Sequence, residues 1–375
     1  MEENMRRTLS RIVVLTLFAV ATIMAQEFSM DQIKELAATN GKLYLQPLAT
    51  GFGTAMNSGL YNTAGTHGTL GFDIQLKTGV GLAPASKASQ TTYQFDLSAL
   101  DDITFDIEKN SQSYSITLNP EEIFSDCTTP NILGGKAEPF TVNQPYVQGE
   151  IESQLRTQLQ AQGLTEEQIN AAITEMNPEI QEAIDGIQVK SIPGMKSIKA
   201  LEDLKTVPFP FPILQASVGL PMGIEPSIRI IPKFKIPGDI GEAIGEISAL
   251  GGGLKLDVDR WIPIPMFPLD IAVQGYYQQM EIGDLLSANS TAFNLMISKT
   301  ILMLTPYIGV GKESSKFTAS YKMEDGTKIK FDLKGKNDTR FTAGLNIKIA
   351  VISINAEYSM GEYNAAGLGV GFALR

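Results

Sequence analysis

Apolar and polar residues alternate almost without interruption in the last part of the chain. From 352 to 360 the apolar residues fall on even positions, and the pattern returns from 367 to 374 with glycine or alanine between the apolar ones. Successive side chains of a strand point to opposite faces, so these runs predict two strands that each have one apolar face. A sandwich, a small barrel or a barrel standing in lipid would satisfy this pattern, whereas a strand in a soluble α/β core would be apolar on both faces.

Residues 1–25 have the features of a cleavable export signal. Three arginines precede an apolar stretch from Ile12 to Met24, and Ala25 offers a small residue at the cleavage point. The stretch is too short to cross a bilayer comfortably as a helix. An uncleaved anchor is the less favoured alternative.

Composition narrows the class of protein further. After residue 25 no window reaches the roughly 18 to 20 consecutive apolar residues that a transmembrane helix requires. Apolar residues are spread along a chain with 34 Gly and 19 Pro, which suits short half-apolar strands and turns. The formal charge of -11 argues against nucleic acid as a partner, because binding to phosphates needs clustered Lys and Arg. Cys127 is the only cysteine, so an intramolecular disulfide is excluded.

Residues 26–65 precede the regular alternation and are expected to form a plug-like segment. A short helix is predicted from Met30 to Thr39, with Asn40-Gly41 as its stop signal. An irregular segment rich in Gly and Asn is expected from Leu43 to Gly65, where Pro47 breaks any regular run. The candidate plug residues are Phe52, Asn57, Tyr61 and Asn62.

The remaining alternation predicts an all-β fold, a transmembrane antiparallel β-barrel over residues 66–375. We count about twelve strands, in a range of about 10–14, from the period-two runs. Two of these are a stretch from Tyr93 to Ile107, interrupted at Asp101-Asp102, and a short run from Tyr114 to Leu118. The period-two runs define this strand number to within about two.

A helical extracellular insertion is expected at about 146–190. Gln148 to Gly163 and Thr165 to Gly186 should form two helices, and Gln168 completes a capping box at the start of the second. The favoured interpretation is a solvated helical hairpin that caps the fold. The alternative is a pair of helices that binds an external partner.

Two further patterns favour a barrel in the outer membrane. The connections between predicted strands alternate between short and long, as they do in outer-membrane barrels. The face opposite the apolar one carries charges that a soluble core could not hold unpaired, so it must meet water or a polar plug. The candidate lumen-facing charges are Arg229, Lys233, Lys255, Asp257, Asp259, Arg340, Lys348 and Glu357.

Four segments also resemble a known group of proteins. They are Leu45 to Ala64, Asp259 to Tyr277, Thr305 to Gly311 and the closing EYNAAGLGVGFALR. Together these segments resemble an uncharacterised family of outer-membrane β-barrel proteins from Bacteroidota-type bacteria, a domain of unknown function. More distantly, a barrel preceded by a Gly- and Asn-rich segment is similar to the long-chain fatty-acid transporter family. That resemblance implies a hatch inside the lumen.

Catalytic chemistry is not indicated by the sequence. His67 is the only histidine, and no nucleophile and base motif accompanies it, so a structural role is favoured. Asp257 and Asp259 could bind a cation, but the adjoining Lys255 favours ion pairing. We therefore expect no enzyme activity, no catalytic residue, no cofactor and no metal.

Two functional hypotheses of different class remain. The first is a porin-like passage or uptake barrel with a plugged lumen, which would admit a small solute, including a hydrophobic one. The second is a structural or surface-binding barrel that transports nothing and contacts a partner through the helical insertion. Either protein would be located in the bacterial outer membrane, in contact with its lipid, and would meet the barrel-assembly machinery during biogenesis.

Overall fold

The computed structural model describes residues 30–109, 111–187, 193–197, 199, 201–235, 246–261, 268–283, 286–322 and 328–374. The predicted export signal lies outside these residues. The described chain divides into two compact units. One contains residues 45–90 and 203–374, and the other contains residues 30–44 and 91–202. None of the described helices is both long enough and apolar enough to cross a membrane.

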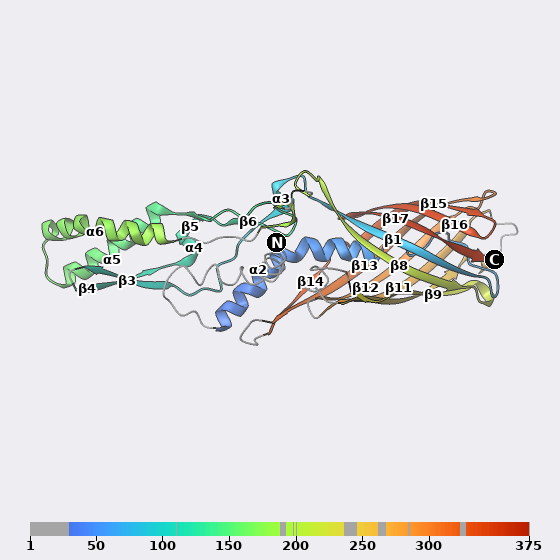
Figure 1. Ribbon diagram of the computed structural model, residues 1–375, viewed down its shortest axis with the longest axis horizontal. Helices are drawn as coiled ribbons and strands as arrows, with labels where there is room; N and C mark the ends of the chain where they lie inside the picture. The colour runs from blue at the N-terminus through green and yellow to red at the C-terminus, as the bar shows by residue number, and fades with distance from the viewer. Residues whose placement is uncertain are drawn as a thin grey trace. The chain divides into compact units, whose positions relative to one another are not determined.

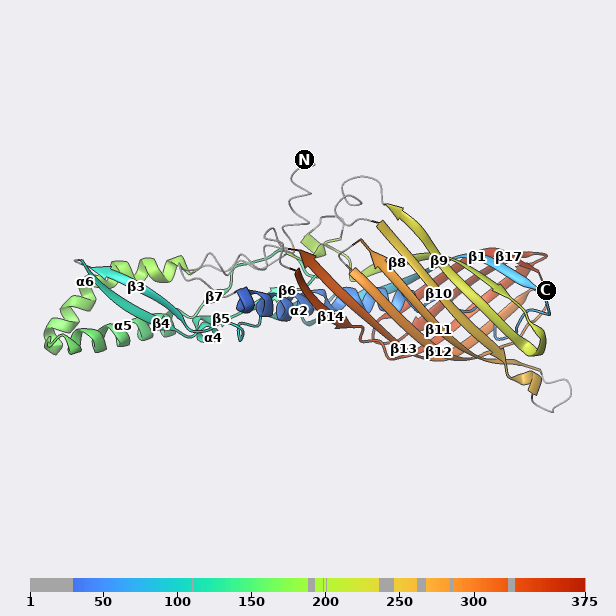
Figure 2. The same cartoon turned by 90° about the horizontal axis from the view of Figure 1, so that it is seen from below.

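The first unit is a closed antiparallel barrel of ten tilted strands (Figures 1 and 2). The pairing order is β12-β11-β10-β9-β8-β1-β17-β16-β15-β13, and pairing of β12 with β13 closes the ring. One further strand, β14 (Lys328–Lys334), pairs with the far part of β13. The ring strands are β1 (Phe72–Pro84), β8 (Thr206–Val218), β9 (Ile224–Lys235), β10 (Glu246–Asp257), β11 (Asp270–Ile282), β12 (Leu286–Ser298), β13 (Leu304–Lys322), β15 (Thr339–Ile349), β16 (Ile352–Met360) and β17 (Asn364–Leu374).

The burial of alternate residues is inverted relative to a soluble barrel. In β16 the apolar residues Ile352 and Ile354 are exposed, whereas Ser353 and Asn355 are each only 1% exposed. The same inversion occurs in β1, where Leu76 is exposed and Lys77 is buried. The alternation in the sequence therefore separates an apolar outer face from a buried inner face, as it does in membrane barrels.

The sequence predicted a polar inner face, but only part of the inner face is polar. Near the ends of the strands that are remote from both Phe72 and Leu374, an apolar cluster joins the inner face to helix α2 (Met30–Met56). Ala49 and Met56 of the helix are fully buried in this cluster. The wall contributes Phe211, Ile213, Ile231, Met280, Phe317 and Leu333. Polar and charged side chains occupy the other half of the inner face.

Helix α2 is longer than the sequence predicted. The predicted stop at Asn40-Gly41 is wrong, because the helix continues through it and through Pro47 to Met56. The Asn40 side chain is buried and exchanges hydrogen bonds of 2.8 Å with the main chain of Asp96 in both directions. These contacts make a helical Asn40 favourable despite its low intrinsic propensity. The irregular segment begins only at Asn57 and runs to 71.

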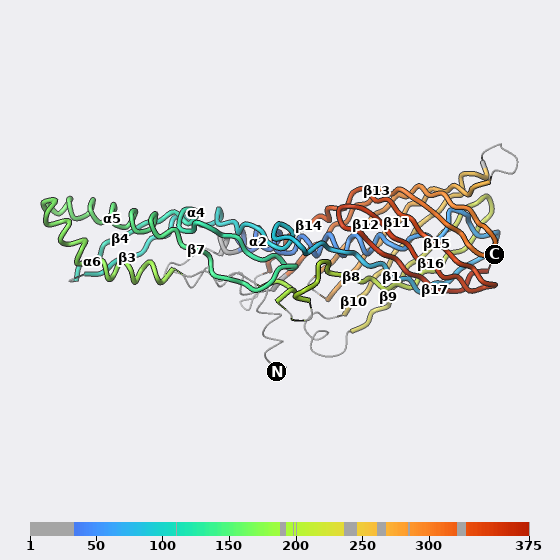
Figure 3. The backbone as a smooth tube through the Cα atoms, turned by 90° about the horizontal axis from the view of Figure 1, so that it is seen from above, coloured from blue at the N-terminus to red at the C-terminus, as the bar shows by residue number. Residues whose placement is uncertain are grey.

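The second unit contains strands that the sequence assigned to the barrel. The hairpin of β3 (Ile103–Lys109) and β4 (Gln112–Leu118) pairs with itself alone. Its apolar side packs on α5 (Gln144–Ala161) and α6 (Glu166–Gly186), which lie beside it in Figure 3. Alternation in such a hairpin faces a helical layer rather than lipid, so the strand number falls from about twelve to ten.

The two predicted helices of this unit are present, and their bounds differ slightly from the prediction. Thr165 and Gln168 form the expected capping box at the start of α6. The smaller elements are α3 (Ala88–Thr91), β2 (Thr92–Gln94), α4 (Pro120–Ile123), β5 (Phe124–Asp126), β6 (Thr128–Pro130), β7 (Thr141–Val142) and η1 (Met195–Ser197), with η2 (Pro221–Gly223) and η3 (Asp259–Trp261) in the barrel unit.

The connections are sorted by length less clearly than the sequence predicted. At the end where β15 turns into β16, most connections are short, but that between β10 and β11 spans twelve residues. At the opposite end, only three residues separate β16 from β17 and β11 from β12. The longest connection at that end joins β1 to β8 and contains most of the second unit.

The seam between β8 and β9 is the shortest pairing in the ring. Only Leu214 to Ser217 pair with Ser227 to Ile230, although β8 pairs with β1 along all 13 residues. Proline has no N–H, and prolines at alternate positions of one strand leave the same edge without donors. Pro208, Pro210 and Pro212 do this to the edge of β8 that faces β9. The ladder therefore stops at Leu214.

Candidate functional site in the barrel lumen

The segment 56–65, at and after the end of α2, is held by cations from the inner face. Four buried side chains, one each from β1, β9, β10 and β15, donate to its main-chain carbonyls. The donors are Lys77 to Gly59 at 3.0 Å, Arg229 to Met56 at 2.9 Å and Ser58 at 3.1 Å, Lys255 to Gly65 at 3.0 Å, and Arg340 to Asn57.

The end of a helix explains why cations gather there. The last carbonyls of a helix have no partner within the helix, and they carry a partial negative charge. Arg229 is fully buried and binds the carbonyls of Met56 and Ser58 together, which suits its planar fork of donors. The inner wall of the barrel therefore caps the carboxyl end of α2.

Buried carboxylates hold the N–H groups of the same segment. Glu357 accepts a hydrogen bond of 2.7 Å from the backbone of Gly59 and another of 3.1 Å from the Tyr307 hydroxyl. Glu225 accepts 2.8 Å bonds from both the backbone N–H and Nδ1 of His67. These contacts come from opposite parts of the ring, so the segment 56–67 crosses the lumen.

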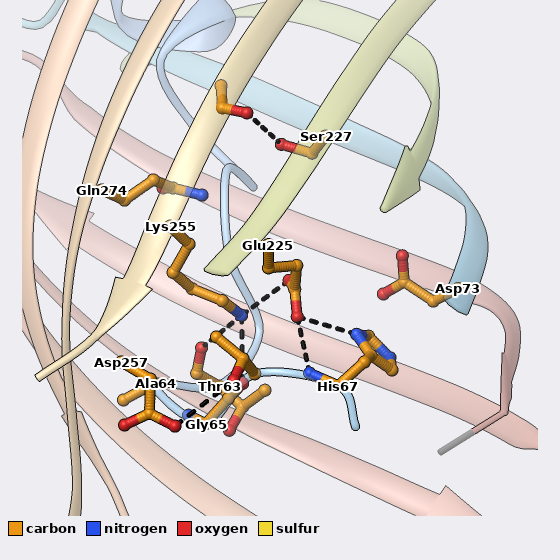
Figure 4. Close-up of polar contacts among 12 residues, drawn as sticks. Thr63, Ala64, Gly65, His67, Asp73, Glu225, Ser227, Lys255, Asp257 and Gln274 are labelled. Atoms are coloured by element: carbon orange, nitrogen blue, oxygen red, sulfur yellow. Dashed lines mark hydrogen bonds and ion pairs between the residues drawn. The ribbon is translucent and has the colours of Figure 1, made fainter. Parts of the chain in front are cut away.

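Glu225 and Lys255 form the centre of a buried polar cluster at one end of the lumen (Figure 4). Their charged atoms are 2.8 Å apart, and both side chains are 6% exposed or less. Lys255 also reaches the carbonyl of Gly65, while Glu225 holds His67, so both ends of the ion pair bind the segment. A buried pair of this kind is stable only when further hydrogen bonds satisfy both partners, as they do here.

Close packing accompanies the polar contacts. A Cβ atom at Gly79 or Gly81 of β1 would overlap the carbonyl oxygens of Ala55 and Gly51. These two glycines therefore let the backbone of α2 approach β1 directly. On other sides Phe52 meets Phe209 edge to face, with centroids 5.2 Å apart, and Tyr61 meets Tyr307 at 5.7 Å.

The candidate plug residues lie in two environments. Phe52 is half-buried on α2 within the apolar half of the lumen. Asn57, Tyr61 and Asn62 are buried in the polar half, and the Tyr61 ring belongs to a small apolar cluster with Tyr307. All four residues therefore contact or face the barrel interior.

The candidate lumen charges fall into two groups, five that are buried and three that are not. Arg229, Lys255, Asp257, Arg340 and Glu357 are all buried, at 8% exposure or less. The remaining three are not fully buried. They are Lys233, exposed beside a register shift between β9 and β10; Asp259, half-buried in η3, where it accepts from the backbone of Ile271; and Lys348, half-buried near the end of β15.

Sequence reasoning missed two carboxylates of the network. Glu225 lies in phase with Arg229, so its parity in β9 already indicated the inner face. Glu313 is buried and pairs with Arg340 at 3.0 Å. Because β13 is long and Glu313 interrupts no apolar run, the sequence pattern did not show on which face of the strand Glu313 lies. The side chain of His67, for which the sequence favoured a structural role, contacts Glu225 through Nδ1 at 2.8 Å.

The arrangement contains no group of three or more His, Cys, Asp or Glu side chains placed to hold a metal, among the residues that the structure describes. The buried charges are used in ion pairs and in bonds to the main chain of residues 56–67. This geometry holds residues 56–67 inside the barrel through ion pairs and hydrogen bonds.

Solved barrels show low similarity to this chain. OmpT of Vibrio cholerae, an outer membrane protein in its trimer form, is 11% identical with a TM-score of 0.23, over 43% of this chain and 55% of that one. The match thus spans about half the length of OmpT. The N-terminal β-barrel domain of Pseudomonas aeruginosa OprF is 15% identical with a TM-score of 0.22, over 41% of this chain and 98% of that one. The translocator domain of the autotransporter NalP from Neisseria meningitidis is 9% identical with a TM-score of 0.18, over 94% and 100%.

No curated protein sequence matches this chain. The ring is defined by the pairing of its own ten strands. A family model matches residues 5–374, nearly the whole chain. The chain belongs to the family of unknown function DUF6588.

Proposed function

We propose that this protein is an outer-membrane barrel whose lumen is closed by residues 45–67, and that displacement of this plug admits a small solute. The apolar outer face supports the location in a bilayer, because a soluble barrel would turn the polar face of its strands outward to water. Large apolar side chains are exposed on all ten ring strands, among them Phe72, Leu214, Ile230, Phe293, Phe341 and Phe372.

The observation that carries the proposal is the crossing of the lumen by residues 56–67. Ten strands enclose more space than the eight that side chains alone can fill, and far less than a porin of 16 strands. In this barrel the additional space is occupied by main chain, held by Glu357 on one side and by Arg229 on another. A barrel built only for stability would not need buried charges directed at a separate segment.

The two halves of the lumen favour an amphipathic or hydrophobic solute. Next to α2 the inner face presents Phe209, Phe211 and Ile231, and it meets Phe52 of the helix. A hydrophobic molecule that displaced the helix would find an apolar wall there. The resemblance of the N-terminal segment to the hatch of long-chain fatty-acid transporters supports the same class of solute.

The test is the conductance of the purified protein in planar lipid bilayers. A variant lacking residues 28–65 should conduct strongly, whereas the full chain should remain mostly closed. Transfer of a fluorescent long-chain alkyl acid into vesicles, compared with that of a small sugar, tests the class of solute. Equal and low conductance of the two proteins would contradict a plug.

A second candidate is a barrel that displays the second unit and transports nothing. Residues 91–202 hold 18 acidic and 6 basic residues, a net of -12, so this unit carries the whole net charge of the chain. Such a unit with its own apolar core could contact a cationic partner. Under this function the variant lacking residues 28–65 would conduct, but no solute would cross the full chain under any condition.

A further inference from the structure

The ribbon formed by β13 and β14 continues the outer face of the barrel with lysines. Residues directly opposite each other in a pair of strands share a face. Lys316 lies opposite Lys334. On β13, Lys316 is in phase with Ile308 and Val310, which are exposed on the apolar outer face.

Like charges placed directly opposite each other destabilise a pair of strands. An ion pair of 2.7 Å between Lys316 and Asp332 relieves part of this repulsion. Lys312 forms a separate ion pair of 2.7 Å with Asp338. Lys330 and Lys334 are exposed and form no ion pair with any carboxylate that the structure describes. The outer face of the ribbon therefore has cationic capacity that its described residues leave unused.

An apolar groove begins where these lysines end. Its volume is about 640 Å³, and Lys312 forms part of its rim. Lys312 lies directly opposite Phe293 on the neighbouring strand, so its aliphatic stem borders the apolar lining. Gly275 leaves the floor of the groove open. The other apolar lining residues are Leu254, Leu256, Val273, Leu295 and Val310.

We propose that this groove and the lysines above it bind one phosphate-bearing lipid, with an acyl chain in the groove and the phosphate on Lys316, Lys330 and Lys334. The inference rests on the part of the proposed function that places the barrel in a bilayer. Lys316 is four residues beyond Lys312 along the strand, about 13 Å at the usual rise. The order from acyl chain to phosphate thus follows the strand from the apolar surface toward water.

A lipid explains both features, whereas a soluble anion explains only one. A free phosphate or an acidic polymer would use the lysines and leave the groove unexplained. A neutral lipid would use the groove and supply no counter-charge to Lys330 and Lys334. Each lysine near an anionic lipid surface contributes about fivefold to binding, so three should contribute more than tenfold together.

The experiment measures binding of phosphatidylglycerol and of phosphatidylcholine with the same acyl chains to the full chain in neutral detergent, by native mass spectrometry. The variant K316Q/K330Q/K334Q removes the three lysines. The matched control K87Q/K205Q/K299Q removes three other exposed lysines of the barrel unit and makes the same change in net charge. Gly275→Leu fills the groove, and inorganic phosphate serves as a competitor.

The wild type and the control should prefer phosphatidylglycerol at least tenfold, and the preference should disappear in K316Q/K330Q/K334Q. Gly275→Leu should weaken lipid binding, and inorganic phosphate should compete poorly. An equal preference in both triple variants would overturn the site, as would full competition by inorganic phosphate with no effect of Gly275→Leu. Insertion into neutral phosphatidylcholine vesicles is scored separately, because its failure would overturn the membrane location instead.

Discussion

The carboxylate of Glu357 on β16 accepts a hydrogen bond of 2.7 Å from the backbone N–H of Gly59, 298 residues earlier in the chain. Both groups are buried in the barrel interior. The next-to-last strand therefore fixes the position of the segment that follows α2. This contact links the folding of the barrel wall to the state of its lumen.

Glu357→Ala should loosen the segment more than it weakens the wall. It removes the acceptor for Gly59 and for the Tyr307 hydroxyl, and a hydrogen bond to a charged group contributes about 1.5–3 kcal/mol. Limited proteolysis of the folded protein should then cleave within residues 57–67. The control Ser359→Ala removes a 2.9 Å bond to Thr342 within the wall and should leave these residues protected. Equal protection of both variants would argue against the role of Glu357.

Arg229→Lys should behave as a non-conservative change. Arg229 donates to Met56, Ser58 and Gln278 from two of its nitrogens, and an ammonium cannot reproduce this fork. We expect a loss of about 1–3 kcal/mol in the free energy of unfolding. The heat-modifiable shift on gels should move to lower temperature. An unchanged midpoint would show that the capping of α2 by Arg229 adds little.

Glu225→Gln should cost far more than the loss of an exposed ion pair. The variant leaves Lys255 buried without its counter-charge, which costs about 3–5 kcal/mol. Asp338→Asn breaks the pair with Lys312, whose side chains are 69% and 65% exposed, and should change stability by about 0–1 kcal/mol. Urea unfolding of both variants in the same detergent makes the comparison. Similar effects at the two sites would contradict the buried network.

The parity of residues in strands made most of the barrel predictable from the sequence. One apolar face in each long run located the outer wall, and the same parity placed Arg229, Arg340 and Glu357 inside. The hairpin at 103–118 alternates between apolar and polar residues as the barrel strands do. This alternation does not distinguish an apolar side covered by lipid from one covered by α5. Only tertiary contacts separate these cases.

The site was less predictable than the wall, for two physical reasons. A register shift beside Ile231 changes the environment of Lys233, and no residue type in the sequence marks that shift. Helix α2 continues past Asn40 because Asp96, distant in sequence, satisfies its side chain. The contacts of residues 56–67 with six or more strands form only when the ring closes. No local sequence pattern predicts this closure.

The thiol of Cys127 should react slowly with alkylating reagents at neutral pH. Burial, with the nearby Asp126 as a smaller cause, raises the pKa of its thiol to about 11. Because the thiolate is the reactive form, alkylation by iodoacetamide should be slow at pH 7–8 and should rise with pH toward that pKa. Unfolding in urea should restore the ordinary pKa of about 8.5 and speed the reaction at pH 8. Fast alkylation of the folded protein at pH 7 would contradict this assignment.

A reversible disulfide tests most directly whether residues 45–67 close the lumen. The hydroxyl oxygens of Thr63 and Ser298 are 3.1 Å apart and join the segment to β12, so cysteines there can form a bond of roughly 2.0 Å. The pair is made in a Cys127→Ser background. The control pair Thr342→Cys and Ser359→Cys links two wall strands at the same kind of buried contact.

The measurement is single-channel current in planar bilayers, in urea just below the concentration that unfolds the barrel. For Thr63→Cys/Ser298→Cys we predict open events under reducing conditions, their disappearance on oxidation and their return on reduction. The wall pair should conduct equally in both states. Open events that persist after oxidation of the segment pair would contradict the claim that this segment closes the barrel.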